Sequence, residues 1–222
     1  AADIVLLNDS FSTIVTTVKW GRGIYENFKR FIQFQLTVNV ASVAIIFLCT
    51  VIGLFTAFEN PFNALDLLWI NIIMDGPPAL TLGLEPIRDD LMKRKPTARG
   101  ESIVSAEMMV KIAVNGIFMC VVCLAQKQWN FLGIPMEGKN AEEVSNTVIF
   151  TLFVLFQLFN AFNCRELGDR SVFPNFFRNK LMLVAFVAAF ALQVVITQFA
   201  GPVFDTVPLG ILDWVKIVAL AF

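Results

Sequence analysis

The chain of 222 residues contains no histidine and a single tyrosine. The absence of histidine removes the most common transition-metal ligand and the side chain most often used for acid–base catalysis near neutral pH. The formal net charge is only −1, so the composition gives no argument for nucleic-acid binding, which relies on an excess of basic residues. The N-terminus is polar and the first long apolar run begins well inside the chain, so we expect no cleavable secretion signal.

Cysteine is also scarce, and its four copies lie in or beside apolar stretches: Cys49, Cys120, Cys123 and Cys164. Thiols in such surroundings are typically packing residues rather than disulfide partners. Cys120 and Cys123 have the spacing of a metal-binding pair, but no second pair accompanies them, so we interpret both as packing residues. Internal repeats and low-complexity linkers are absent as well.

Hydrophobic residues, by contrast, make up 57% of the chain and include 23 phenylalanines. This composition is typical of an integral membrane protein, in which a helix needs about 20 predominantly apolar residues to cross the hydrocarbon. Six stretches meet or approach that length, and the last of them falls short: 36–58, 63–84, 108–129, 145–164, 181–200 and 211–222. The predicted fold is therefore all-α, a polytopic bundle of six transmembrane helices.

The basic residues are distributed unevenly over the connections between these stretches. They gather in the segments 19–30, 85–107 and 165–180. The loops on the other side are almost free of them, apart from Lys127 and Lys139. Because basic residues concentrate on the cytoplasmic side of membrane proteins, we predict that the N-terminus and the basic loops are cytoplasmic.

The first residues form a different kind of sequence. Asp3–Leu7 predicts a short buried strand, and Ser12 is placed to cap a following helix. A lone strand and half a helix cannot build a hydrophobic core. We therefore interpret 1–18 as the end of a larger cytosolic domain, 19–35 as a cytosolic stalk, and 36–222 as the C-terminal transmembrane domain.

The most informative polar residues lie in the middle of the second predicted span. Asn71 and Asp75 are one helical turn apart, and the run Gly76-Pro77-Pro78, which follows, is expected to interrupt the helix. An unneutralised Asp inside a membrane costs about 3 kcal/mol on insertion scales. No basic residue lies at a matching depth in the other complete spans, so a bound cation is the natural partner. Carboxylate, amide and main-chain oxygens suit calcium, magnesium or manganese rather than zinc or copper.

Other amides lie in the predicted spans as well. Asn39 lies at a depth that faces the polar turn of the second span, so we regard it as a candidate ligand. For Gln157 the sequence favours equally a role as a ligand and a role as a hydrogen-bonding contact between helices. The remaining amides are interpreted as hydrogen-bonding groups between helices: Asn115, Asn160, Asn163, Gln193 and Gln198.

These residues resemble a known family, the P-type ATPases, and specifically their calcium pumps, over essentially the whole chain. Residues 1–15 resemble the end of the phosphorylation domain, and 21–25 resemble the entry to the fifth transmembrane helix. Residues 34–40 resemble that helix in plasma-membrane-type calcium pumps. Residues 68–79 resemble the sixth helix of reticulum and secretory-pathway calcium pumps. The six predicted spans would then be helices five to ten of such a pump.

The resemblance implies roles for individual residues. Asn71 and Asp75 correspond to the ion-coordinating Asn and Asp of the sixth helix. Asn39 corresponds to the Asn of the fifth helix. All three are therefore expected to be metal ligands, with Gln157 as a possible secondary one.

The chain departs from the reticulum pumps at several ligand positions. Ser42 and Gln157 stand where those pumps carry Glu ligands, and Met74 stands where they carry a Thr ligand. These losses resemble the plasma-membrane type, whose members keep one calcium site, so we expect one calcium ion per cycle. Leu80 stands where manganese-transporting secretory pumps have a Gln, which favours calcium.

The resemblance also implies what lies outside this sequence. The phosphorylated Asp with its DKTG motif, the nucleotide and actuator domains and the first four helices would belong to a missing N-terminal half, which would use ATP and Mg²⁺. The chain alone is expected to hydrolyse no ATP, and its partners would be that missing half and the lipid bilayer.

Three alternatives remain open. They are a P-type pump for manganese or another cation, a cation-coupled secondary transporter or channel, and a membrane scaffold without an ion site. The strand and helix predicted at the N-terminus and the absence of inverted repeats argue against the secondary transporter.

Overall fold

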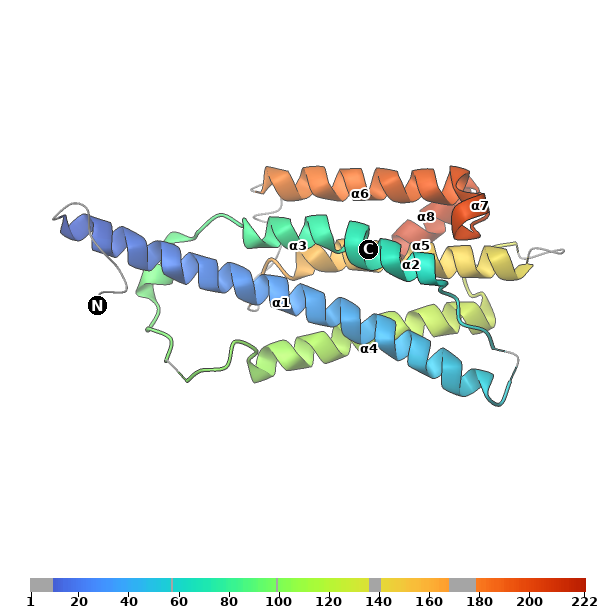
Figure 1. Cartoon of the computed structure of the whole chain (residues 1–222), viewed down its shortest axis with the longest axis horizontal. Coiled ribbons are helices and arrows are strands. Elements are labelled where there is room, and N and C mark those ends of the chain that lie inside the picture. Colours follow the sequence, from blue (N-terminus) through green and yellow to red (C-terminus); the bar gives the residue numbers. More distant parts are fainter. Residues whose placement is uncertain (1–9, 57, 99, 136–140, 168–178) are drawn as a thin grey trace.

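The computed structural model describes residues 10–56, 58–98, 100–135, 141–167 and 179–222. This described part is all-helical and contains no strand. Its helices, drawn in Figure 1, are α1 (Phe11–Gly53), α2 (Ala64–Trp69), the π-helix η1 (Ile70–Met74), α3 (Gly76–Gly83), the 3₁₀-helix η2 (Asp89–Lys93), α4 (Ala106–Trp129), α5 (Ala141–Asn163), α6 (Lys180–Phe199), α7 (Gly201–Phe204) and α8 (Ile211–Ala221). The predicted strand at Asp3–Leu7 lies outside the described residues.

Helix α1 is continuous over 43 residues, a length of about 65 Å. It therefore runs without a break through the predicted stalk into the predicted first span, and its N-terminal end projects beyond the other helices (Figure 1). Its N-cap is Ser10, which has an extended backbone and accepts a bond from the Thr13 amide at 3.1 Å. The prediction that Ser12 caps this helix is wrong, because Ser12 already lies in the first turn. The helix ends at Gly53, earlier than the predicted residue 58.

Four described helices are long and apolar enough to cross a membrane, namely α1, α4, α5 and α6. The predicted second span is divided into three short pieces, and α8 has 11 residues. The predicted count of six spanning helices is therefore not confirmed by helix length. The all-helical character of the described residues and the presence of helices apolar enough to cross a membrane are confirmed.

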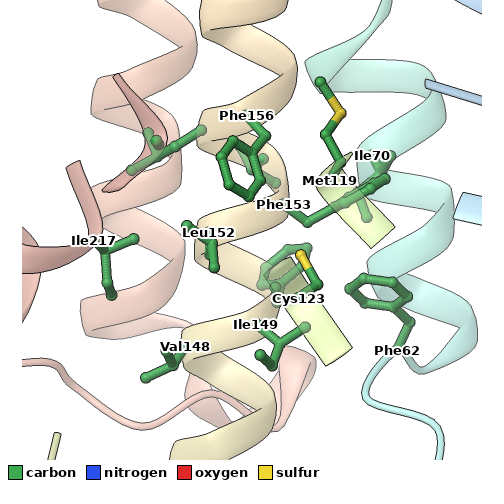
Figure 2. Packing of buried hydrophobic residues seen from close by; sticks show 14 of the residues in the cluster. Phe62, Ile70, Met119, Cys123, Val148, Ile149, Leu152, Phe153, Phe156 and Ile217 are labelled. Carbon is green, nitrogen blue, oxygen red and sulfur yellow. The ribbon is translucent and has the colours of Figure 1, made fainter. Parts of the chain in front are cut away.

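Helix α5 is the centre of the bundle. In its most apolar stretch 83% of the residues are buried, against about a third or less in the other three long helices. Figure 2 shows Leu152 and Phe153 of α5 between Ile217 of α8 and Phe62 beside α2. The Phe62 and Phe153 rings lie 5.3 Å apart. The long helices around α5 are therefore free to turn most of their apolar surface toward lipid.

The cysteines take part in the same packing. All four are free and buried: Cys49, Cys120, Cys123 and Cys164. Figure 2 shows Cys123 among the hydrophobic residues of the core. Their interpretation as packing residues is confirmed.

The second predicted span is broken, but slightly earlier than the sequence indicated. The π-helix η1 leads to Asp75, whose amide donates to the Ile70 carbonyl five residues earlier at 3.0 Å. Pro77 and Pro78 then lie in the first turn of α3, where the lack of an amide proton does no harm. The distortion therefore precedes the prolines and is centred on the segment that carries Asp75.

A close contact fixes α1 against the segment that follows α3. A Cβ atom added to Gly23 would lie 2.5 Å from Cγ1 of Ile87, which is too close for any side chain. We expect Gly23→Ala to reduce the free energy of unfolding by about 1–3 kcal/mol through overpacking. Thermal or denaturant unfolding of the purified protein measures this loss.

Gly21 provides the matched control for this prediction. It lies two residues earlier in α1, and a Cβ there would meet nothing within 4 Å. Gly21→Ala should therefore stabilise the helix by up to about 1 kcal/mol. Trimming the neighbour with Ile87→Ala should rescue the Gly23→Ala variant, and equal behaviour of the two glycine variants would contradict the proposed contact.

Candidate cation site in the membrane

Asp75 lies between η1 and α3 and is 1% exposed. Its Oδ2 atom accepts a long hydrogen bond of 3.4 Å from Nε2 of Gln35 on α1. Its Oδ1 atom is buried and has no hydrogen-bond partner within the described part of the chain. A carboxylate in this state is poorly compensated, because burial of a charge is expensive unless it is paired or coordinates a metal.

Gln35 is a neighbour of the site that the sequence reasoning missed. It precedes Asn39 by one turn of α1, so the two amides lie on the same side of that helix. This spacing was the signal that could have identified it. Asn39 itself is half-buried and lies one turn further along α1 than Gln35, which contacts Asp75.

Asn71 differs from Asp75 in burial. Its side chain is exposed, and its Nδ2 atom donates to the Leu67 carbonyl at 2.8 Å. The amide oxygen is not used in that bond and remains available to a partner. The π-turn between Asn71 and Asp75 replaces the regular helical spacing from which a common face was predicted.

The backbone around Asp75 adds further oxygen. The residues four and five positions after Ile73 are Pro77 and Pro78, and neither has an amide proton. The Ile73 carbonyl therefore has no donor in either the α or the π register. Such a carbonyl is the kind of oxygen that calcium accepts as a ligand.

Helix α5 contributes two buried amides without partners. Gln157 is 0% exposed and Asn160 is 1% exposed, and neither the oxygen nor the nitrogen of either amide has a hydrogen-bond partner among the described residues. The interpretation of Asn160 as a hydrogen-bonding contact between helices is therefore not borne out. Asn160 lines a cavity of about 370 Å³ together with Asn115 and Asn163.

Of the remaining four amides, Gln193 makes a hydrogen bond between helices as the sequence suggested, and Gln198 bonds to the loop before α8. The Trp69 indole donates to Oε1 of Gln193 at 3.2 Å, which links α2 to α6. Gln198 donates to the Leu209 carbonyl at 2.7 Å. Both are structural hydrogen bonds.

No group of three Asp, Glu or Cys side chains in the described part of the chain is arranged to hold a metal ion. Asp75 is therefore a single carboxylate among amide and main-chain oxygens. This donor set fits a hard cation that tolerates neutral oxygen ligands, and it does not fit a thiolate-bound metal.

A second buried polar cluster lies at the end of the bundle that carries the basic loops, and the sequence did not single it out. Nη2 of Arg165 lies 2.8 Å from Oε1 of Glu85, and both side chains are almost fully buried. Nδ2 of Asn179 donates to the other Glu85 oxygen at 2.8 Å. Nε of Arg30 on α1 donates to the Arg165 carbonyl at 2.8 Å. We call Glu85, Arg165, Asn179 and Arg30 the clamp cluster.

The clamp cluster has further support around it. Nδ2 of Asn27 on α1 donates to the Glu85 carbonyl at 2.8 Å and to the Gly83 carbonyl at 3.1 Å. Arg88 pairs with Glu166, whose hydrogen bond and charge raise the pKa of Arg88. The cluster thus joins α1, the end of α3, the end of α5 and the start of α6. It fixes the depth of the segment that carries Asp75.

Apolar helices around a broken helix with a buried, uncompensated carboxylate define an integral membrane protein of the cation-transport class. The family description "Cation transporting ATPase, C-terminus" matches residues 59–222, and the chain belongs to this family. It is the C-terminal membrane region of a P-type cation ATPase.

Curated relatives agree with this assignment. The chain is 39% identical over 221 residues to "Calcium-transporting ATPase 12, plasma membrane-type" of Arabidopsis thaliana, covering 100% of this chain and 21% of the relative. It is 36% identical over 211 residues to "Probable calcium-transporting ATPase 6, plasma membrane-type" of Oryza sativa subsp. japonica, covering 95% and 20%. It is 37% identical over 230 residues to "Plasma membrane calcium-transporting ATPase 2" of Oreochromis mossambicus, covering 99% and 20%. The chain thus spans about a fifth of the length of the curated relatives it matches.

Proposed function

We propose that this chain is the C-terminal membrane part of an ATP-driven pump that exports calcium from the cytosol. In this proposal it supplies part of one intramembrane calcium site. The observation that carries the proposal is the Oδ1 atom of Asp75, which is buried beside distorted backbone and has no partner among the described residues. A passing divalent cation would supply the missing positive charge.

Asp75 would be the anionic ligand of this site. Asn39 and Asn71 would add amide oxygens, and Gln157 would be a secondary ligand or a neighbour of the site. The Ile73 carbonyl would add a main-chain oxygen. Since only one of these ligands carries a charge, we infer that the site takes one ion per cycle.

The rest of the pump would lie in the part of the protein that this chain does not include. That part would hold the phosphorylated Asp and the sites for ATP and Mg²⁺. Residues 1–18 would complete the phosphorylation domain, and 19–35 would transmit its movement to the membrane. The N-terminus of the chain would be cytoplasmic, since the described parts of the basic segments meet at one end of the bundle, where Lys19 pairs with Asp89 and Arg88 with Glu166.

The experiment that tests this function is ion transport by the full-length protein in sealed vesicles. We expect ATP-dependent calcium uptake and an aspartyl-phosphate that forms only when calcium is present. Calcium should compete effectively with manganese, and one calcium ion should move per ATP. Preferred transport of manganese would point to the related manganese pump, and transport without a phosphorylated intermediate would point to a secondary transporter.

Asn39 allows a finer test of the ligand set. We expect Asn39→Ala to weaken the apparent calcium affinity of transport by roughly tenfold, because one neutral oxygen ligand is lost. Asn115→Ala, which removes a half-buried amide from α4, is the matched control and should leave the affinity unchanged. Equal affinities in both variants would remove Asn39 from the site.

A further inference from the structure

We propose that a second divalent cation site lies at the opposite end of the bundle from the basic loops. It lies at the right-hand end of Figure 1, where the starts of α2 and α5 meet the turn after α7. A cavity of about 130 Å³ opens there, and its polar lining includes Asn63, Asp66, Glu143, Asp205 and Thr206. This site is separate from the intramembrane site and goes beyond the proposed transport function.

Asp66 provides the main evidence. It is 4% exposed, and its Oδ2 atom accepts a hydrogen bond from the Asn63 amide at 2.9 Å. The Asn63 side chain in turn accepts a bond from the Asp66 amide at 2.8 Å, so the two residues cap α2 reciprocally. The Oδ1 atom of Asp66 is buried and has no partner among the described residues.

Asp205 brings a second carboxylate to the same cavity. It has a left-handed backbone, with φ of 50°, which is uncommon outside glycine but tolerated by Asp and Asn. Nδ2 of Asn63 lies 3.5 Å from Oδ2 of Asp205. Asn63 therefore contacts both carboxylates and places them around one space.

A purely structural role for Asp66 does not account for this arrangement. Capping of α2 uses only one of its two carboxylate oxygens, and the other remains buried beside a further carboxylate. The described residues that line the cavity include three acidic side chains and no basic one. Among the described residues the nearby cation is Lys127, but its Nζ atom donates to Asn146 at 2.8 Å and lies over the Phe58 ring at 5.5 Å. A metal ion is thus the missing counter-charge.

The donor atoms define the class of ion. The available ligand atoms are side-chain oxygens, from Asp66, Asp205, Glu143 and Thr206. Such a set suits calcium, which takes six to eight oxygen ligands. Since no three acidic side chains of the described residues form a complete metal site, amide, hydroxyl and main-chain oxygens and water would complete the coordination. An ion held there would fix the start of α2, and thus the broken helix that carries Asp75, against α5 and α7.

Terbium luminescence offers a direct test, because Tb³⁺ replaces calcium and emits when a nearby tryptophan is excited. Trp69 is well placed for this, since its ring lies 5.7 Å from that of Phe204, which lines the cavity. The full-length protein would carry Asp75→Asn, to remove the intramembrane site, and would be reconstituted in phosphatidylcholine vesicles. We expect Tb³⁺ emission that calcium displaces.

Two variants decide the outcome. Asp66→Asn keeps the capping oxygen, and Asp205→Asn alters an exposed residue whose backbone suits Asn equally well. Each should weaken Tb³⁺ binding by at least about tenfold. Glu107→Gln, an exposed carboxylate at the other end of the bundle, should leave binding unchanged. Unchanged binding in both Asn variants would overturn the proposal, and so would the loss of all emission in Asp75→Asn alone.

Discussion

Replacing Asp75 by Asn is expected to abolish calcium-dependent transport by the full-length protein while the helix bundle stays folded. The substitution keeps the size of the side chain and an oxygen for the bond from Gln35, but it removes the negative charge that the ion would neutralise. If that charge contributes about 3 kcal/mol to ion binding, the apparent calcium affinity falls by about a hundredfold. Uptake of radioactive calcium into vesicles and calcium-dependent phosphorylation both measure the effect.

Stability gives the independent check on this prediction. Calcium should raise the unfolding temperature of the wild-type protein by more than that of the Asp75→Asn protein, because a ligand stabilises only the state that binds it and the variant keeps only the second site proposed above. Without calcium the variant should be at least as stable as the wild type, since an uncompensated buried charge has been removed. Glu107→Gln should behave like the wild type throughout. Calcium transport at normal affinity by the Asp75→Asn protein would contradict the role of Asp75 as an ion ligand.

Breaking the buried ion pair between Glu85 and Arg165 is expected to produce the largest loss of stability. Arg165→Met leaves the Glu85 carboxylate almost fully buried, with Asn179 as its remaining side-chain hydrogen-bonding partner among the described residues. Removal of one member of such a pair costs about 3–5 kcal/mol, because the remaining charge is buried without compensation. Unfolding of the purified protein in detergent measures the change.

A double variant separates the ion pair from the general packing of the region. Glu85→Gln combined with Arg165→Met removes both charges and keeps the shapes, so it should recover most of the stability lost in Arg165→Met. The exposed pair between Lys111 and Glu107 is the control, and Lys111→Met should cost less than about 1 kcal/mol. Losses of similar size in the single and double variants would show that the charges themselves do not hold the clamp cluster together.

Much of the fold could be predicted from the sequence, because a hydrophobic stretch identifies itself locally. The apolar runs that contain α1, α4, α5 and α6 are visible without any knowledge of their neighbours. Asp75 could be identified in the same way, since a carboxylate beside two prolines in an apolar stretch is a local pattern. The cysteines could be assigned to the core for the same reason.

The exact position of the break in the second apolar stretch could not be predicted from the sequence. The sequence placed the interruption at the prolines, whereas the structure has a π-turn before Asp75 and uses the prolines to begin α3. The number of spanning helices also could not be fixed, because α2, η1 and α3 are each too short to be judged by length. Whether these three short helices together cross the membrane depends on the helices that pack against them.

The sequence by itself identified this chain as a helical membrane domain, because hydropathy is a sum over neighbouring residues, and it predicted a cation site at the carboxylate of the second apolar stretch. Only the tertiary structure decided which polar side chains meet. Glu85 contacts Arg165 and Asn179 across separations of 80 and 94 residues, and Asn63 meets Asp205 across 142. Such contacts depend on which helices pack together, and the burial that makes them strong exists only once the bundle has formed.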